Sequence, residues 1–215
     1  SDMMMAYEAY LKNNGVSPNS SSFYMRNLRA VYNRAVEKEL TPQRFPFKHV
    51  YTGVDKTVKR AVPLKVIKRI KEMDFSMNPS FDFARDMFLM SFYTRGMSFV
   101  DMAYLRKKDL QNGVLSYRRR KTGQQLFIKW EKCMQEIVDK YDTSQSNYLL
   151  PIIKPFGDID ERTQYIYAAH NINRCLKIIG KELGLSVSLT LYVARHAWAS
   201  IAKSKNVPLS VISEG

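Results

Sequence analysis

The chain has 215 residues, enough for one large domain or two small ones, and 45% of them are hydrophobic, which excludes a disordered protein. Its net charge is +14, from 34 basic and 20 acidic residues, and an excess of this size favours a polyanionic partner such as nucleic acid. No apolar stretch approaches the roughly 18 residues that a membrane span needs, so we expect no membrane partner.

The first 40 residues predict two helices. The first covers about residues 3–13 and ends at Asn14-Gly15, and the loop "VSPNSSS" separates it from a second helix over about residues 23–38. Arg26 and Arg29 lie on a different face of the second helix from its apolar stripe, so that face either contacts DNA or is simply solvated.

Residues 41–62 are irregular and contain Pro42, Pro46 and Gly53, which indicates a boundary between domains. We predict a helical N-terminal domain over residues 1–58, a linker over 59–63 and a larger domain over 64–215.

The larger domain is predicted to be mostly helical. One helix begins at residue 63 or 64, and a second begins near Ser80, whose side chain can cap it. Further helices are expected over about residues 131–141 and 161–183, and another follows from a cap at Thr190 to about Lys203. A last short turn begins at Pro208.

In the middle of this domain the hydrophobic pattern changes from a helical period to that of a β-strand. A turn at Asn112-Gly113, a short apolar run, the sequence "KTG" and the run "QQLFIKW" predict a β-hairpin. The predicted fold class is therefore mainly α with a small antiparallel β-sheet (α+β).

The hairpin is strongly basic. Residues 106–132 contain nine basic and two acidic residues, a net charge of +7 that is half of the total. Three consecutive arginines before the "KTG" turn, Arg118, Arg119 and Arg120, are candidate DNA contacts.

Metal and cofactor chemistry is not expected. Cys133 and Cys175 have no metal-ligand spacing and are expected to be reduced, and the three histidines have no ligand spacing among themselves. There is no Walker phosphate loop, no GxGxxG and no HExxH, so the sequence predicts no cofactor and no metal site.

Three cations occur in unusual places: Arg95 after an apolar helix, Lys121 at the hairpin tip and Arg195 within an apolar helix. Cations from separate elements can surround one phosphate and stabilise a phosphoryl transition state. Each also has a structural alternative, because Arg95 can pair with Asp101 or Asp86, Lys121 can be ordinary surface decoration, and Arg195 can extend from its helix into solvent.

The order of these residues resembles the tyrosine recombinases, or phage-type integrases, most of all those of Bacteroides-type mobile elements. The resemblance lies in "TRGMSFVDMAYL" (94–105), "RRRKTGQQL" (118–126) and "YVARHAW" (192–198), and it covers about residues 63–215. It implies that residues 1–58 are part of a SAM-like core-binding domain and that residues 64–215 are a catalytic domain. It also implies Arg95, Lys121, Tyr192 and Arg195 as site residues.

Two of these residues depart from the family's pattern. Ser98 stands where the family's first arginine belongs, and Arg95, one helical turn or roughly 4.5 Å earlier, is the expected substitute. Tyr192 replaces a histidine and is expected to position a phosphate oxygen from the same helix face as Arg195, or else to pack near the hairpin. His196 points about 100° away on the helix and is expected to be structural.

A third departure concerns the nucleophile. The family attacks DNA with a tyrosine well beyond the second arginine, but no tyrosine follows Arg195 in this sequence. We therefore expect a C-terminally truncated piece of a recombinase.

The resemblance implies site-specific DNA recombination or integration through a 3′-phosphotyrosyl intermediate, with double-stranded DNA and other recombinase protomers as partners. This piece is expected to bind DNA without cleaving it, in the cytoplasm of a bacterium and on the nucleoid when bound. The alternatives are a DNA-binding protein with a decayed active site, and a relative of the type IB topoisomerases or telomere resolvases.

Overall fold

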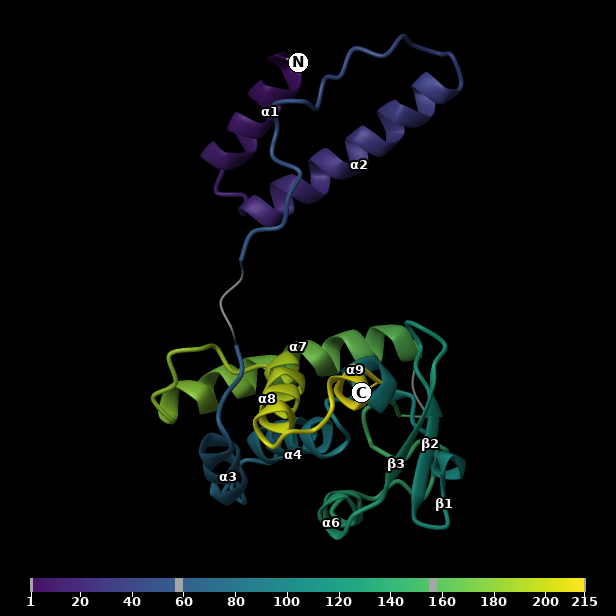
Figure 1. Ribbon diagram of the computed structural model, residues 1–215. Helices are drawn as coiled ribbons and strands as arrows, with labels where there is room; N and C mark the ends of the chain where they lie inside the picture. The colour runs from purple at the N-terminus through teal and green to yellow at the C-terminus, as the bar shows by residue number, and fades with distance from the viewer. Residues whose placement is uncertain (1, 57–59, 155–157, 215) are drawn as a thin grey trace. The chain divides into compact units, whose positions relative to one another are not determined.

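The computed structural model describes residues 2–56, 60–154 and 158–214 (Figure 1). The chain divides into two compact units, Ser1–Lys59 and Arg60–Gly215. Residue 59 of the predicted linker lies outside the described residues.

The N-terminal unit contains helices α1 (Asp2–Asn13) and α2 (Pro18–Glu37). Leu11, Met25 and Val50 form its small core. Helix α2 begins at Pro18 and not near Phe23 as predicted, so much of the expected loop is helical. The cause is local: Ser17 is extended and its side chain accepts a hydrogen bond from the Ser20 N–H, while proline suits the first helical position.

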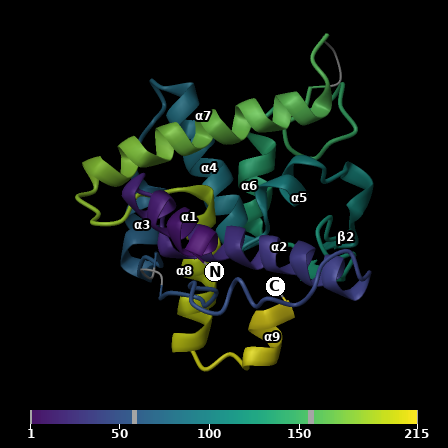
Figure 2. The same cartoon turned by 90° about the horizontal axis from the view of Figure 1, so that it is seen from above.

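The C-terminal unit holds the remaining helices. These are α3 (Leu64–Glu72), α4 (Pro79–Tyr93), α5 (Phe99–Ala103), the 3-10 turn η1 (Lys107–Asp109), α6 (Lys132–Asp139), α7 (Glu161–Glu182), α8 (Leu191–Ser204) and α9 (Leu209–Glu214). Helix α4 packs against both α7 and α8, and α7 runs along the length of the unit (Figure 2).

Helix α4 is the centre of this core. Ala84, Met87, Phe88 and Met90 are completely buried, so α4 is apolar on most of its circumference, as expected for a helix covered on several sides. Its cap is Asn78, which accepts from the Phe81 N–H, with Pro79 at the first position. The prediction of Ser80 as the cap was wrong, because this proline begins the helix one residue earlier.

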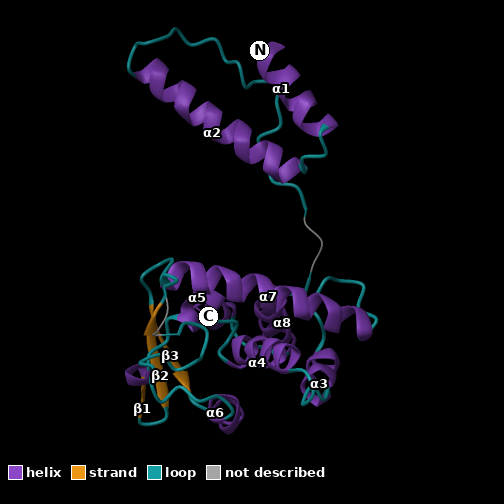
Figure 3. Cartoon of the chain, turned by 180° about the vertical axis from the view of Figure 1, so that it is seen from behind, coloured by secondary structure: helices purple, strands orange, loops and turns teal. Residues whose placement is uncertain are grey.

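Three antiparallel strands in the order β1-β2-β3 form the sheet: β1 (Leu110–Gln111), β2 (Val114–Arg118) and β3 (Gln125–Lys129). The pairs Leu115–Ile128 and Tyr117–Leu126 place their side chains on the face that joins the core. The sheet lies at one end of the unit and α3 at the other (Figure 3). The predicted hairpin and the α+β fold class are confirmed, and the short strand β1 was not predicted.

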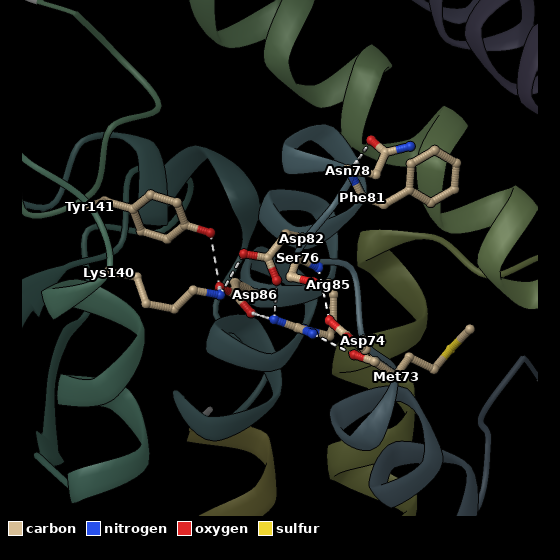
Figure 4. Close-up of polar contacts among 10 residues, drawn as sticks. All are labelled: Met73, Asp74, Ser76, Asn78, Phe81, Asp82, Arg85, Asp86, Lys140 and Tyr141. Atoms are coloured by element: carbon tan, nitrogen blue, oxygen red, sulfur yellow. Dashed lines mark hydrogen bonds and ion pairs between the residues drawn. The ribbon is translucent and has the colours of Figure 1, made fainter.

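A buried ion-pair cluster joins α4 to the segment after α6 (Figure 4). Asp86 is 2% exposed and accepts hydrogen bonds from Arg85, from Lys140 at 2.5 Å and from the Tyr141 hydroxyl at 2.8 Å. Asp82 pairs with the same arginine and lysine. Burial and the charge of Asp86 raise the pKa of Tyr141, so its hydroxyl remains a donor.

Among the described residues, no helix is long and apolar enough to cross a membrane. Cys133 and Cys175 are both free thiols.

Candidate active site

The site begins at a left-handed turn that ends α4. The Thr94 N–H bonds to the Met90 carbonyl and the Gly96 N–H to the Ser91 carbonyl, which is the usual closure of a helix C-terminus. Arg95 has φ +59°, a conformation that such turns normally give to glycine. The backbone thereby places the exposed Arg95 side chain on the surface beside the sheet.

Arg195 reaches this turn from α8. Its Nη1 donates to the Gly96 carbonyl at 3.0 Å, and the residue is half-buried. Gly96 has φ +75°, and a Cβ added there would lie 2.8 Å from the Arg195 Cα. Helix α8 can therefore approach the turn only because residue 96 is glycine, and the same contact fixes the guanidinium.

Arg119 comes to the site from the end of β2. Side chains alternate along this strand, so Arg119 follows Leu115 and Tyr117 toward the inner face, and it is half-buried while Arg118 is exposed. Burial lowers the pKa of Arg195, and the neighbouring charge of Arg119 lowers it further. The two guanidiniums are therefore electrostatic neighbours, and both stay charged because arginine is protonated throughout the physiological range.

Tyr117 links the three arginines. Burial first, and the charge of Asp101 second, raise the pKa of the Tyr117 hydroxyl to about 12. The charges of Arg119, Arg195 and Arg95 act on the same hydroxyl in the opposite direction. Since such effects fall off with distance, residues from α8, from the turn after α4 and from the hairpin lie within electrostatic range of this hydroxyl.

A cavity of about 430 Å³ opens beside the ring. It is lined by Thr94, Arg95, Tyr117 and the strand β3 side, namely Gln124, Gln125, Leu126, Phe127 and Ile128. The cavity is therefore bounded by a cation and by amide groups, which suits an anionic or strongly polar ligand.

Neither acid that could neutralise Arg95 does so. Asp101 is buried, accepts from the Ser98 hydroxyl at 2.6 Å and accepts from the Arg120 backbone N–H at 2.9 Å. Asp86 belongs to the cluster with Lys140 and Tyr141 (Figure 4). In the described part of the chain, no acidic side chain pairs with Arg95, Arg119 or Arg195.

Ser98, where the sequence resemblance leads us to expect an arginine, has a structural contact. It caps α5, and its hydroxyl also holds Asp101, which in turn holds the base of the hairpin loop through Arg120. The Arg120 guanidinium lies 3.9 Å from the centre of the Tyr104 ring and so is directed onto an aromatic face.

The hairpin loop presents its remaining cations outward. Arg118 donates to the Gly123 carbonyl at 2.9 Å and is exposed. Lys121 is exposed at the tip, and no hydrogen bond or ion pair involves its side chain within residues 60–154 and 158–214. The structure therefore places Arg95, Arg119 and Arg195 within electrostatic range of one hydroxyl, and it leaves Lys121 exposed at the tip of the loop.

Tyr192 lies one turn before Arg195 on α8. It is 59% exposed and its ring meets the His196 ring edge-on at 4.4 Å between centroids. His196 is partly buried against this tyrosine.

Arg26 and Arg29 belong to the N-terminal unit and are exposed on α2. Arg29 donates to the Thr52 hydroxyl at 3.3 Å, and with Tyr32 and Lys48 it borders a cavity of about 290 Å³.

Sequence reasoning treated the three hairpin arginines as equivalent DNA contacts and did not single out Tyr117. The signal was available in the strand alternation, which directs residues 115, 117 and 119 to one face. The alternation of side chains cannot predict that Arg195 lies near Arg119, because that depends on the packing of α8 against α4.

Comparison with known proteins agrees with this architecture. Residues 1–50 match the family model described as the phage integrase SAM-like domain. A lambda integrase dimer bound to a COC′ core site matches with a TM-score of 0.70 and 14% identity, over 98% of this chain and 72% of that one. The Tn1549 transposon integrase in complex with circular intermediate DNA matches with a TM-score of 0.65 and 16% identity, over 97% and 74%.

The chain has the fold of a tyrosine recombinase. The predicted resemblance to phage-type integrases is confirmed at this level. A lambda integrase tetramer bound to a Holliday junction matches with a TM-score of 0.66 and 15% identity, over 98% of this chain and 61% of that one. The recombinase fold described here thus spans about three fifths to three quarters of these integrases, and no curated protein matches the sequence.

Proposed function

We propose that this chain binds double-stranded DNA and that its C-terminal unit is the catalytic domain of a tyrosine-type site-specific recombinase or integrase. One observation carries the proposal: Arg95, Arg119 and Arg195 come from three separate elements, act on one tyrosine hydroxyl and have no acidic partner in the described part of the chain. Unneutralised arginines gathered at one point are suited to a phosphate group.

The reaction that fits these residues is a transesterification. A tyrosine hydroxyl attacks a DNA phosphodiester, a 3′-phosphotyrosyl bond forms, and the 5′-hydroxyl leaves; attack by another 5′-hydroxyl reverses the step. The three arginines would bind the non-bridging oxygens and stabilise the charge of the five-coordinate transition state. Lys121, on the loop, would protonate the leaving oxygen, and Tyr192 would donate to a phosphate oxygen.

Arg119 is the addition that geometry makes to the predicted set. The Ser98 hydroxyl caps α5 and binds Asp101, so it does not bind a phosphate. The position at which the family has its first arginine therefore supplies no positive charge. Arg119, an electrostatic neighbour of Arg195, supplies the positive charge that residue 98 lacks. Arg95 supplies a further positive charge at the cavity.

The tyrosines near the arginines are unsuited to the attack. Tyr117 is 7% exposed and its pKa is raised to about 12, so its hydroxyl resists deprotonation. Tyr192 has the position, one helical turn before Arg195, of the residue that we propose donates a hydrogen bond to a phosphate oxygen, and not that of the nucleophile. We therefore propose that this chain binds DNA without cleaving it, and that a recombinase carrying this unit uses a tyrosine supplied from outside these residues.

The DNA contacts proposed outside the site are Arg26 and Arg29 in the N-terminal unit and Arg118 and Arg120 on the hairpin. These cations are exposed or lie at the surface, where they would bind backbone phosphates without reading sequence. Further protomers bound to the same DNA are the other proposed partners.

The test is binding of the chain to a generic 20-base-pair duplex, measured by fluorescence anisotropy at several salt concentrations. We expect affinity to fall steeply with salt, since each neutralised phosphate contributes about −0.9 to the slope of log K against log salt. Affinity that does not change with salt would contradict phosphate contacts.

Two adjacent arginines make a matched pair of variants. Arg118→Gln and Arg119→Gln each remove one charge from the hairpin, but of the two only Arg119 is half-buried and lowers the pKa of Arg195. In a recombinase that carries this unit and its nucleophile, Arg119→Gln is expected to slow cleavage by about 100-fold or more, and Arg118→Gln mainly to weaken binding. Equal effects on cleavage would refute the role of Arg119.

A DNA-binding protein with a decayed active site remains the second candidate, because Ser98 and Tyr192 replace an arginine and a histidine. The same cleavage assay separates the two, since a decayed site would give no covalent adduct in any longer form. Exchange between paired sites, as opposed to simple relaxation of supercoils, separates a recombinase from a topoisomerase-like relative.

A further inference from the structure

The Tyr117 hydroxyl is an unused donor at the centre of the site. The residue is 7% exposed, yet in the described part of the chain its hydroxyl has no hydrogen-bond partner. The one fully enclosed polar side-chain atom without a partner among those residues is the Ser21 oxygen, so the Tyr117 oxygen is not sealed off. The hydroxyl is therefore open to water and can donate to a ligand that displaces this water.

The surroundings of the hydroxyl define the chemistry of that partner. Arg95 and Tyr117 line the same cavity of about 430 Å³, and Arg119 and Arg195 also act electrostatically on the hydroxyl. One cation and one O–H donor in the same cavity, with two further arginines close enough to act on that donor, are complementary to an oxyanion with several acceptor oxygens.

We propose that the Tyr117 hydroxyl donates a hydrogen bond to an oxygen of the phosphate group that Arg95, Arg119 and Arg195 bind. Tyr117 is thereby a phosphate-binding residue and not a nucleophile. The proposal rests on the proposed function of the arginines and adds a neutral donor to them.

A tyrosine offers this site something that a fourth cation does not. Its pKa of about 12 keeps the O–H protonated at physiological pH, so it donates without adding to the repulsion among the arginines. Its ring is fixed in the core beside Leu126 through the strand register, so the donor needs little ordering when the phosphate arrives.

Inorganic phosphate is the probe, titrated at constant ionic strength while the arginine Nε–H resonances of the 215-residue chain are followed by NMR. In the natural sequence, the resonances of Arg119 and Arg195 are expected to shift with one common dissociation constant. Tyr117→Phe is expected to raise that constant about tenfold, the size of one hydrogen bond to a charged group.

Tyr93→Phe is the matched control. Burial also raises the pKa of Tyr93 to about 12, but its electrostatic neighbours are Cys133, Glu136 and Asp86 in place of arginines. This variant should leave phosphate affinity unchanged. An equal dissociation constant in Tyr117→Phe and the natural chain would overturn the proposal, as would a DNA adduct that forms on Tyr117.

Failure of the proposed function has a different signature. If Arg119→Gln leaves phosphate binding intact, both the phosphate site and the role of Tyr117 are refuted. If Arg119→Gln abolishes binding while Tyr117→Phe does not weaken it, only the role of Tyr117 is refuted. Should Tyr117→Phe fold poorly, a 3-fluorotyrosine placed at position 117 gives the same answer, because its ¹⁹F resonance must shift with phosphate; an unmoved resonance overturns the proposal.

Discussion

Arg95 occupies a backbone conformation that glycine would adopt at lower cost. A non-glycine residue at φ +59° is held there by the surrounding turn, and such conformations cluster at functional sites. The turn thus retains a charged side chain at the edge of the cavity at the expense of some stability.

Arg95→Gly should separate these two effects. We expect the free energy of unfolding in urea to rise by about 0.5–1 kcal/mol, since the left-handed strain disappears, while affinity for duplex DNA falls with the lost charge. Asn206→Gly is the control, because Asn206 has the same φ of +59° after α8 and carries no charge. A loss of stability in Arg95→Gly would mean that the arginine side chain supports the fold.

Gly96→Ala should damage both fold and site. The added Cβ would lie 2.8 Å from the Arg195 Cα and would sit at φ +75°, so α8 must shift away from the turn. We expect a loss of about 1–3 kcal/mol in the free energy of unfolding and weaker DNA binding. Gly113→Ala is the control: Gly113 also has a positive φ, but an added Cβ would meet no neighbouring atom, so this variant measures the cost of the backbone strain alone. If the two variants lose equal stability, the contact with Arg195 is unimportant.

For single residues, the sequence predicted which side chains belong to the candidate site but not which groups they contact. Arg95 and Arg195 stand out from their apolar surroundings in the sequence alone. The contact between Arg195 and the Gly96 carbonyl, and the neighbourhood of Arg119, depend on side chains from elements far apart in the chain.

Helix α4 connects the core to the site, and the buried cluster around Asp86 fixes one side of it (Figure 4). Asp86 binds a cation from its own helix, Arg85, and another, Lys140, from the end of α6. A buried carboxylate with several donors is expected to contribute mainly by holding these two elements in one arrangement.

Asp86→Asn should therefore destabilise the C-terminal unit by about 3 kcal/mol or more, because two cations lose a buried partner. Asp82→Asn is the comparison, since Asp82 contacts the same two cations but its side chain is 21% exposed, and its loss should cost about 1 kcal/mol. Thermal unfolding followed by circular dichroism measures both. Similar losses would show that burial of Asp86 adds nothing.

Secondary structure was predictable wherever a periodic pattern ran for several turns, as in α7 and α8. Errors occurred where one local contact decides a boundary: Ser17 with Pro18 starts α2 early, and Asn78 with Pro79 starts α4. Strand β1 has two residues and exists only through its pairing with β2, so no window of its own sequence predicts it.

For the whole molecule, tyrosine burial sets the response to alkali. Burial raises the pKa of Tyr93, Tyr117 and Tyr148 to about 12, against an ordinary value of about 10 in the unfolded chain. The folded state therefore keeps these protons longer, and their contribution to stability is complete below pH 10 and disappears as pH rises toward 12.

We expect the free energy of unfolding to be constant between pH 8 and 9 and to fall between pH 10 and 12, with tyrosinate absorbance appearing together with unfolding. Urea titrations at each pH measure this. The fall should be shallower in Tyr93→Phe, which removes one of the tyrosines whose pKa is raised by folding. Tyrosinate that forms well below the unfolding transition would contradict the raised pKa values.

The hydrogen bond between Arg195 and Gly96 joins residues 99 positions apart. A ribosome synthesises the basic hairpin well before α8. The nascent chain therefore first exposes the hairpin cations without an ordered phosphate site. The site is assembled only when α8 packs against α4. The order of synthesis thus leaves the hairpin cations unorganised until α8 has been made.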